Sequence, residues 1–204
     1  CPRYSGMIIE NVKPGPSPRW LADRLTTIGL RPVNNIVDIT NFVLMEYGQP
    51  LHAFDKELLE NSTIIVRRAL KNEAFISLDG NQLKLDEDIL VIADAKKPVA
   101  LAGIMGGANS QVTESTRHIV LESASFDSTT VRKGSKKYGL RSDSSIRFER
   151  GIDVEGLISA QARAALLIQK LAGGIILKGR VDLHPAPRKA KIVSLRVSRL
   201  NQVL

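Results

Sequence analysis

Short apolar runs of strand length are the feature that most constrains what this chain can fold into. Between residues 63 and 106 they read TIIVRRA, EAFISL, ILVIAD and VALAGIMG, and Asp79-Gly80 marks a turn after the second run. Apolar and β-branched runs bounded by turn residues are typical of strands. Another such run, HIVLES, begins at His118. The centre of the chain is therefore predicted to be rich in β-strands.

A strand and a helix are predicted at the amino end. Tyr4 to Val12 alternates like a strand, and Pro14-Gly15-Pro16 ends it because proline fixes φ and has no N–H donor. The next segment is predicted to be a helix with Ser17 as its N-cap and Gly29 after its last turn. Its expected apolar face consists of Trp20, Leu21, Leu25 and Ile28.

Two further helices and a last strand complete the pattern. Ile36 to Tyr47 and Val154 to Leu171 have helical apolar spacing, the second with Asp153 as its cap and Gly173-Gly174 at its end. Ile175 to Leu183 is predicted to be a strand, and the polar, basic stretch between HIVLES and RFERGID carries no predicted element. We therefore expect an α+β fold, in which helices pack against mixed or antiparallel β-sheets.

Composition excludes several classes of protein. With 43% hydrophobic and 25% charged residues, and only 15 Gly and 9 Pro in 204 residues, the chain is neither disordered nor collagen-like. The longest charge-free stretch, Pro98 to Thr113, is too short and too polar to cross a bilayer, so no membrane partner is expected. One cysteine, Cys1, allows no internal disulfide and fits a reducing compartment. The expected location is the cytoplasm.

Positive charge is concentrated in the last third of the chain. Residues 1–131 contain 13 Lys and Arg against 16 Asp and Glu, whereas residues 132–204 contain 16 against 5. A basic region of this kind suits a polyanion such as RNA, although solvated basic faces are also common. The amino end, CPRYSGMIIE, has no initiator Met, secretory core or cleavage site, so the chain is interpreted as a piece of a longer protein.

Few sequence motifs carry chemistry by themselves. The segment GIMGGANS lacks the lysine and glycine spacing of nucleotide-binding loops, and its glycines form either a tight turn or a backbone that a ligand can approach. The three histidines, His52, His118 and His184, are too far apart to share metal-ligand spacing. His118 and His184 read as surface or strand-end residues. His52 follows Gly48-Gln49-Pro50, where the pattern favours a structural histidine over an acid or base at a pocket rim.

Glu122 is a carboxylate inside the otherwise apolar and small run HIVLESASF. If its side chain points inward, it needs a hydrogen-bond donor from a neighbour or from a ligand hydroxyl. If it points outward, it is merely solvated. The residues alone leave both possibilities open.

Four long motifs, taken in order, resemble one family. They are RPVNNIVDITNFVLMEYGQPLHAFD at 31–55, LAGIMGG at 101–107, VLESASFD at 120–127 and RSDSSIRFERGID at 141–153. Together they resemble the bacterial phenylalanyl-tRNA synthetase beta subunit, over the region of its central editing domain. The resemblance covers essentially the whole chain.

The resemblance implies a hydrolytic proofreading domain that releases tyrosine from tRNA(Phe) mischarged with tyrosine. A synthetic site for phenylalanine rejects tyrosine poorly, because tyrosine adds only a hydroxyl, so a second site that reads this hydroxyl is needed. The family's hydroxyl-reading glutamate matches Glu122, and its histidine and asparagine near the ester match His52 and Asn41. Other residues expected at the pocket are Thr40, Pro50, Ala102, Gly103, Gly106 and Ser144. Ser144 stands where the family is expected to carry alanine.

The resemblance also implies partners and boundaries. Residues 1–186 are expected to form the editing domain, and residues 187–204 a linker and the start of the next beta-subunit domain. The expected partners are tRNA(Phe) and the synthetase alpha subunit, in an alpha2-beta2 heterotetramer. No cofactor or metal is expected in this chain, whereas ATP and Mg2+ serve the complete enzyme, whose activation site belongs to the alpha subunit.

Two other functions remain open at this point. The first is a non-catalytic module of the same synthetase that positions tRNA or forms a subunit interface. The second is a generic basic RNA-binding domain, which would bind RNA without discriminating the attached amino acid. The presence of His52, Asn41 and Glu122 favours the editing function over the first of these, because a site without activity is free to lose these residues.

Overall fold

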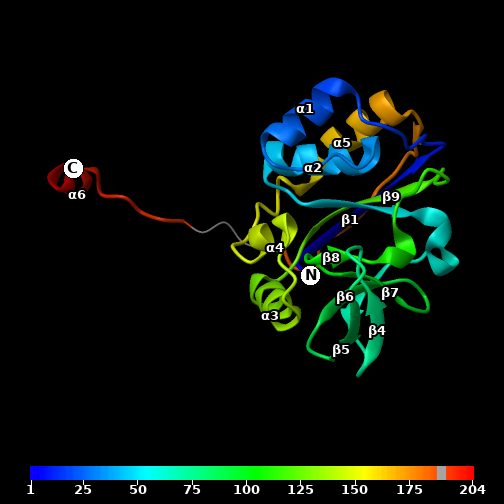
Figure 1. Cartoon of the computed structure of the whole chain (residues 1–204). Helices are drawn as coiled ribbons and strands as arrows, with labels where there is room; N and C mark the ends of the chain where they lie inside the picture. Colours follow the sequence, from blue (N-terminus) through cyan, green and yellow to red (C-terminus); the bar gives the residue numbers. More distant parts are fainter. Residues whose placement is uncertain (188–191) are drawn as a thin grey trace.

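The computed structural model describes residues 1–187 and 192–204 (Figure 1). Its largest sheet has five antiparallel strands. The path runs β10 (Ile175–Ile176), β1 (Arg3–Glu10), β9 (Ile119–Ser125) and β2 (Leu51–Asp55), and β11 (Val181–Leu183) also pairs with β1. In Figure 1 this sheet lies between a layer of helices and a second region rich in strands.

The second region contains two smaller antiparallel sheets. One has the order β3 (Ile65–Arg68), β6 (Leu90–Ala93), β7 (Pro98–Leu101) and β8 (Met105–Gly106). The other pairs β4 (Glu73–Ile76) with β5 (Gln82–Leu85). The predicted β-rich centre and the α+β class with antiparallel sheets and packed helices are therefore confirmed.

Alternation along β9 divides the interior into two cores. Ile119 and Leu121 belong to an apolar cluster that they share with α1 (Arg19–Thr27), α2 (Asn35–Tyr47) and α5 (Leu157–Ala172). Ala124, on the opposite face, belongs to a cluster with the smaller sheets. Successive side chains of a strand point to opposite faces, so Glu122 also points away from the three helices, toward the smaller sheets.

Helix α2 matches its prediction and positions part of the site. The Asn34 side chain accepts hydrogen bonds from the N–H groups of Ile36 and Val37, and Gly48 ends the helix at φ 71°. Helix α1 differs from its prediction. Pro18, not Ser17, is its N-cap, because the Ser17 hydroxyl donates to the Asp38 carboxylate instead.

The predicted apolar face of α1 is half wrong. Leu21 and Leu25 are buried, but Trp20 is 40% exposed and Ile28 54% exposed. Trp20 packs edge-to-face on Phe42 with ring centroids 5.7 Å apart, near the surface.

The polar, basic stretch contains two helices that apolar spacing does not reveal. Helix α3 (Ser128–Tyr138) starts at the Asp127 cap, whose carboxylate accepts from the Thr130 N–H, and ends at Gly139 with φ 66°. Helix α4 (Asp143–Phe148) starts at a capping box between Ser142 and Ser145. Capping residues, rather than an apolar stripe, define these two helices.

Two further predictions at the carboxyl side are corrected. Gly156, not Asp153, precedes α5, because the Asp153 carboxylate accepts from the Glu155 N–H in the preceding turn. The predicted strand Ile175 to Leu183 is two short strands, β10 and β11, separated by Gly179 at φ 94°.

Three single-turn 3-10 helices complete the described elements: η1 (Lys56–Leu58), η2 (Glu60–Ser62) and η3 (Ala108–Ser110). The predicted linker from residue 187 lies partly outside the described residues, and the apolar pattern after it forms α6 (Val197–Val203), none of whose residues is buried. Within the described ranges, no helix combines the length and apolar character that crossing a membrane requires.

Candidate functional site

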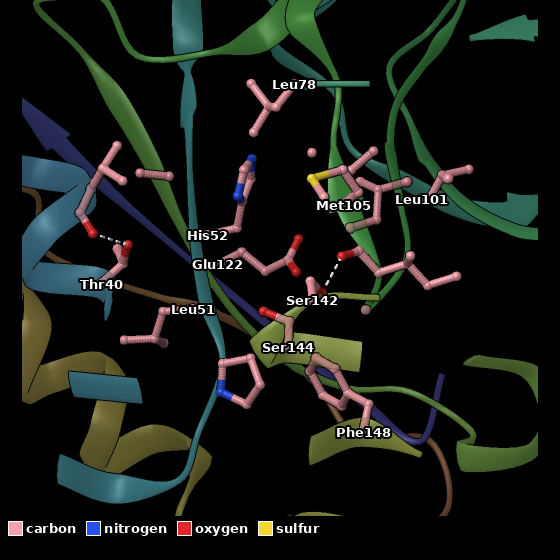
Figure 2. A pocket seen from close by; sticks show the side chains of 18 of the residues that line it. Thr40, Leu51, His52, Leu78, Leu101, Met105, Glu122, Ser142, Ser144 and Phe148 are labelled. Carbon is pink, nitrogen blue, oxygen red and sulfur yellow. Dashed lines mark hydrogen bonds between the residues drawn. The ribbon is translucent and has the colours of Figure 1, made fainter. Parts of the chain in front are cut away.

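A pocket of about 230 Å³ lies between the large sheet and the β6–β8 sheet, bordered by α2 and α4 (Figure 2). It is smaller than the roughly 300–1,000 Å³ typical of drug-sized ligands, so it suits a group of amino-acid size. The residues that line it are Val37, Thr40, Asn41, Pro50, Leu51, His52, Ala53, Leu78, Ile92, Ala100, Leu101, Gly103, Ile104, Met105, Gly106, Glu122, Ser142, Ser144 and Phe148.

Strand register brings His52 and Glu122 together. They are direct partners across the antiparallel pair β2–β9, and Gly6 of β1 is the partner of Glu122 on its other side. Directly opposed residues of antiparallel strands place their side chains on the same face. Both side chains therefore reach the pocket, as Figure 2 shows.

The Glu122 carboxylate is buried, with 6% of the residue exposed. Its Oε2 accepts a hydrogen bond of 2.8 Å from the Tyr4 hydroxyl. Burial raises the pKa of Glu122 to about 7, while the Tyr4 hydrogen bond acts in the opposite direction. The same burial, together with the nearby carboxylate, holds the pKa of Tyr4 well above its ordinary value, so Tyr4 remains a donor.

His52 is enclosed and lacks an internal partner. Its Nε2 atom is buried and forms no hydrogen bond within the described residues. The ring packs edge-to-face on Phe54, with centroids 4.5 Å apart. Burial lowers the pKa of His52 to about 4, so the imidazole is neutral near pH 7. A neutral imidazole with an unpartnered nitrogen can orient a polar ligand group.

Helix α2 and the segment after it supply the neighbouring wall. The Thr40 hydroxyl donates to the Val37 carbonyl at 2.7 Å, which fixes its orientation in the helix. Asn41 also lines the pocket, and its amide forms no hydrogen bond within the described ranges. Pro50 follows the left-handed Gly48 and introduces β2, which carries His52.

Two glycines, Gly103 in the loop between β7 and β8 and Gly106 in β8, make room for protein side chains. Gly103 has φ 72°, and a Cβ atom there would lie 2.9 Å from the Phe148 ring. A Cβ on Gly106 would lie 2.6 Å from Cε1 of His52. The tight-turn interpretation is thus correct for Gly103, and Gly106 is small because His52 occupies the adjacent space.

The structure brings eight of the nine predicted site residues to one pocket. The exception is Ala102, which is 1% exposed, donates its N–H to the Leu90 carbonyl at 3.0 Å and does not line the pocket. It packs in the adjoining apolar core. His118 precedes β9 and His184 follows β11, both at strand ends as predicted.

Sequence reasoning missed several lining residues. Ser142 caps α4 and donates its hydroxyl to the Ile104 carbonyl at 2.6 Å, which joins α4 to the β7–β8 loop. Serine is a preferred N-cap residue, so Ser142 was a readable signal for the start of a helix. Leu78 is an apolar residue of an ordinary strand pattern, so nothing in the sequence marks it as a pocket residue, whereas Met105 lies within the motif LAGIMGG.

The pocket does not fit a magnesium–nucleotide site. Glu122 is its one carboxylate, and no lysine or arginine is among the residues that line it. Across the described residues, no group of three or more His, Cys, Asp or Glu side chains is arranged to hold a metal ion. Magnesium prefers carboxylate and phosphate oxygens, and phosphates are usually held by cationic or backbone N–H donors.

The chain is similar over its whole length to phenylalanine–tRNA ligase beta subunits. It is 52% identical to that of Salinibacter ruber and 50% identical to that of Geobacter sulfurreducens, in each case over 204 residues and 100% of this chain. It covers 25% and 26% of these relatives, so it spans about a quarter of their length.

A solved structure shares the fold. An N-terminal fragment of the phenylalanyl-tRNA synthetase beta subunit from Pyrococcus horikoshii has a TM-score of 0.55, covering 98% of this chain and 55% of that one. At 12% identity this likeness concerns the fold alone. A family model described as the B3/4 domain matches residues 1–173 of this chain. With most of its length matched, the chain belongs to the B3/4 domain family.

Proposed function

We propose that this chain is the editing domain of a phenylalanine–tRNA ligase beta subunit, and that its pocket hydrolyses tyrosine from tRNA(Phe). The observation that carries this proposal is the buried Glu122 carboxylate, which faces a mainly apolar pocket of amino-acid size. The 52% and 50% identity to beta subunits supports it.

Selection for tyrosine follows from the cost of an unpartnered buried acceptor. Tyr4 already donates to Oε2 of Glu122. Tyrosine in the pocket offers a hydroxyl donor to the other oxygen, Oε1, whereas phenylalanine leaves that oxygen without one. A buried polar group that loses its partner costs about 1–3 kcal/mol, and more if it is charged. A site built around a hydroxyl can therefore discriminate far better than an apolar pocket that merely tolerates one.

His52 and Asn41 are proposed to position the ester and the attacking water. Because burial keeps His52 neutral and weakly basic, we expect most of its contribution to come from orientation. The terminal ribose hydroxyl of the tRNA is the second group expected near the water, and no covalent nucleophile takes part. Thr40, Pro50, Gly103, Gly106 and Ser144 are proposed to shape the space around the amino acid.

The proposed setting is a complete cytoplasmic synthetase. The alpha subunit would bind ATP and Mg2+ and activate phenylalanine, while this chain would contribute proofreading. The excess of basic residues in the last third of the chain is proposed to contribute affinity for the tRNA backbone, since phosphate neutralisation supplies sequence-independent affinity.

Deacylation by the reconstituted synthetase tests this function. Release of tyrosine and phenylalanine from tRNA(Phe) would be compared in the wild type, in Glu122→Ala and in the exposed-carboxylate control Glu87→Ala. We expect the wild type and the control to prefer tyrosine, and the preference to fall by roughly a hundredfold in Glu122→Ala. Equal release of both amino acids by all three proteins would assign the domain to tRNA positioning or subunit contact instead.

A further inference from the structure

We propose that Tyr4 is a positioning residue for specificity: its buried hydroxyl holds one oxygen of Glu122 so that the other faces the amino acid in the pocket. The inference rests on the proposed editing function and deepens it. Tyr4 lies outside the pocket lining, so it acts through Glu122 and does not touch the ligand.

The position of Tyr4 follows from strand geometry. Gly6 is the cross-strand partner of Glu122, and Tyr4 stands two residues before Gly6 on the same face of β1. Tyr4 is therefore the diagonal neighbour of Glu122, within reach of a long side chain. Its hydroxyl lies 2.8 Å from Oε2, and only 8% of the residue is exposed.

The hydrogen bond makes the two carboxylate oxygens different. Oε2 accepts from Tyr4, whereas Oε1 has no partner within the described residues. Without Tyr4, the terminal torsion of a glutamate is broad and the carboxylate can rotate. With Tyr4 in place, one oxygen is held in the core and the other is left for a ligand hydroxyl.

Tyr4 also favours the charged form of Glu122. A donor to a carboxylate stabilises the anion, so the Tyr4 hydroxyl opposes the rise in the pKa of Glu122 that burial causes. The other groups that face this carboxylate are His52 from β2 and the hydroxyls of Ser142 and Ser144 at α4. Burial keeps His52 neutral near pH 7, so Glu122 is the pocket group that changes charge there.

Tyr4→Phe tests the inference in the complete synthetase. The ratio of tyrosine to phenylalanine release would be measured from about pH 6 to about pH 8.5, since this window brackets a titration near neutrality. Phenylalanine release is the internal reference, because ordinary pH effects on ester hydrolysis cancel in the ratio. In the wild type we expect the ratio to rise with pH through about 7.

In Tyr4→Phe we expect the ratio near neutral pH to fall about tenfold and its midpoint to move up by about one pH unit, as loss of one hydrogen bond to a charged group implies. The matched control is Tyr138→Phe, which removes a phenol hydroxyl that donates to the Lys84 carbonyl at 3.1 Å, away from the pocket. The control should leave both the ratio and the midpoint unchanged.

A double-mutant cycle separates positioning from general damage. In a Glu122→Gln background, which cannot ionise, Tyr4→Phe should no longer move the pH profile. If Tyr4→Phe lowers tyrosine and phenylalanine release equally and leaves the midpoint of the pH profile unchanged, the proposal is overturned and Tyr4 has only a structural role. If instead the wild type releases both amino acids equally, or Glu122→Ala keeps the preference, the editing function itself fails, and that result is distinct from failure of Tyr4.

Discussion

The two faces of the large sheet differ in how many hydrogen-bond partners their buried polar groups have. On the helix face, the Ser5 hydroxyl donates to Oε1 of Gln161 at 2.7 Å. The Gln161 amide donates to the carbonyls of Ser5 and Leu121 at 3.1 and 2.8 Å. The Ser123 hydroxyl donates to the Leu157 carbonyl at 3.0 Å. All of these partners belong to the fold itself.

On the pocket face, the same sheet carries buried polar groups whose hydrogen-bonding capacity is only partly used. Nε2 of His52 has no partner within the described residues, and Glu122 has Tyr4 alone. Glu122 and Ser123 are adjacent in β9, yet the Ser123 hydroxyl has its partner within the fold whereas one oxygen of Glu122 has none in the described residues. A buried polar group without a partner costs about 1–3 kcal/mol, and in a pocket a ligand can supply that partner. The polar groups on the helix face therefore stabilise the fold, and those on the pocket face are the ones that we propose bind a ligand.

Gln161→Ala should produce the largest effect on stability. It removes three buried hydrogen bonds and leaves the Ser5 hydroxyl without its acceptor, so the free energy of unfolding should fall by about 3–5 kcal/mol. Urea denaturation measures this change. Gln169→Ala, at an exposed position of the same helix, is the control and should stay within about 0.5 kcal/mol. A loss in Gln161→Ala no larger than in the control would remove the distinction between the faces.

The pH dependence of stability should reveal the opposite titrations of the pocket. The folded pKa of Glu122 is about 7, above its ordinary 4.5, so its contribution is present below pH 4.5 and is lost as the pH rises through 7. The folded pKa of His52 is about 4, below 6.5, so its contribution is present above pH 6.5 and is lost as the pH falls through 4. Each effect amounts to about 3 kcal/mol, and they nearly cancel in the wild type.

Single variants should uncover each titration. Glu122→Gln leaves His52 alone, so stability relative to the wild type should decline on acidification between pH 6.5 and 4. His52→Gln leaves Glu122 alone, so stability should decline as the pH rises from 4.5 to 7. Urea denaturation at a series of pH values measures both, with the exposed Glu87→Gln as the control. Parallel pH profiles for the wild type and both variants would show that burial does not shift these groups.

Local sequence signals predicted much of the fold and of the pocket, but not the contacts between distant segments. Apolar spacing identified α2, and motif similarity brought His52 and Glu122 into one hypothesis. Helices α3 and α4 were not predicted, because capping residues rather than apolar stripes define them. The bond between Tyr4 and Glu122 joins residues 118 positions apart, and that between Ser5 and Gln161 joins residues 156 apart. Strand register creates the first of these hydrogen bonds, and packing of α5 on the sheet creates the second. No local sequence pattern encodes either of them.

Two serines at α4 repeat the comparison on a smaller scale. The Ser142 hydroxyl accepts from the Ser145 N–H and donates to the Ile104 carbonyl, whereas the Ser144 hydroxyl lines the pocket without a partner in the described residues. Ser142→Ala should therefore lower the free energy of unfolding by about 1–2 kcal/mol, as loss of an N-cap does. Ser144→Ala should change stability by less than about 0.5 kcal/mol, because nothing in the fold depends on its hydroxyl.

Ser144→Ala also tests whether Glu122 is the only group that recognises a substrate hydroxyl. If the carboxylate reads it alone, Ser144→Ala should change the ratio of tyrosine to phenylalanine release by less than about twofold, because the pocket loses no group that the amino acid needs. A tenfold fall in that ratio, measured on the reconstituted synthetase, would instead make Ser144 a second reader. Two groups on the pocket face, Glu122 and Ser144, would then read the same substrate hydroxyl, and the contrast with the helix face, where the polar groups bond within the fold, would be sharper.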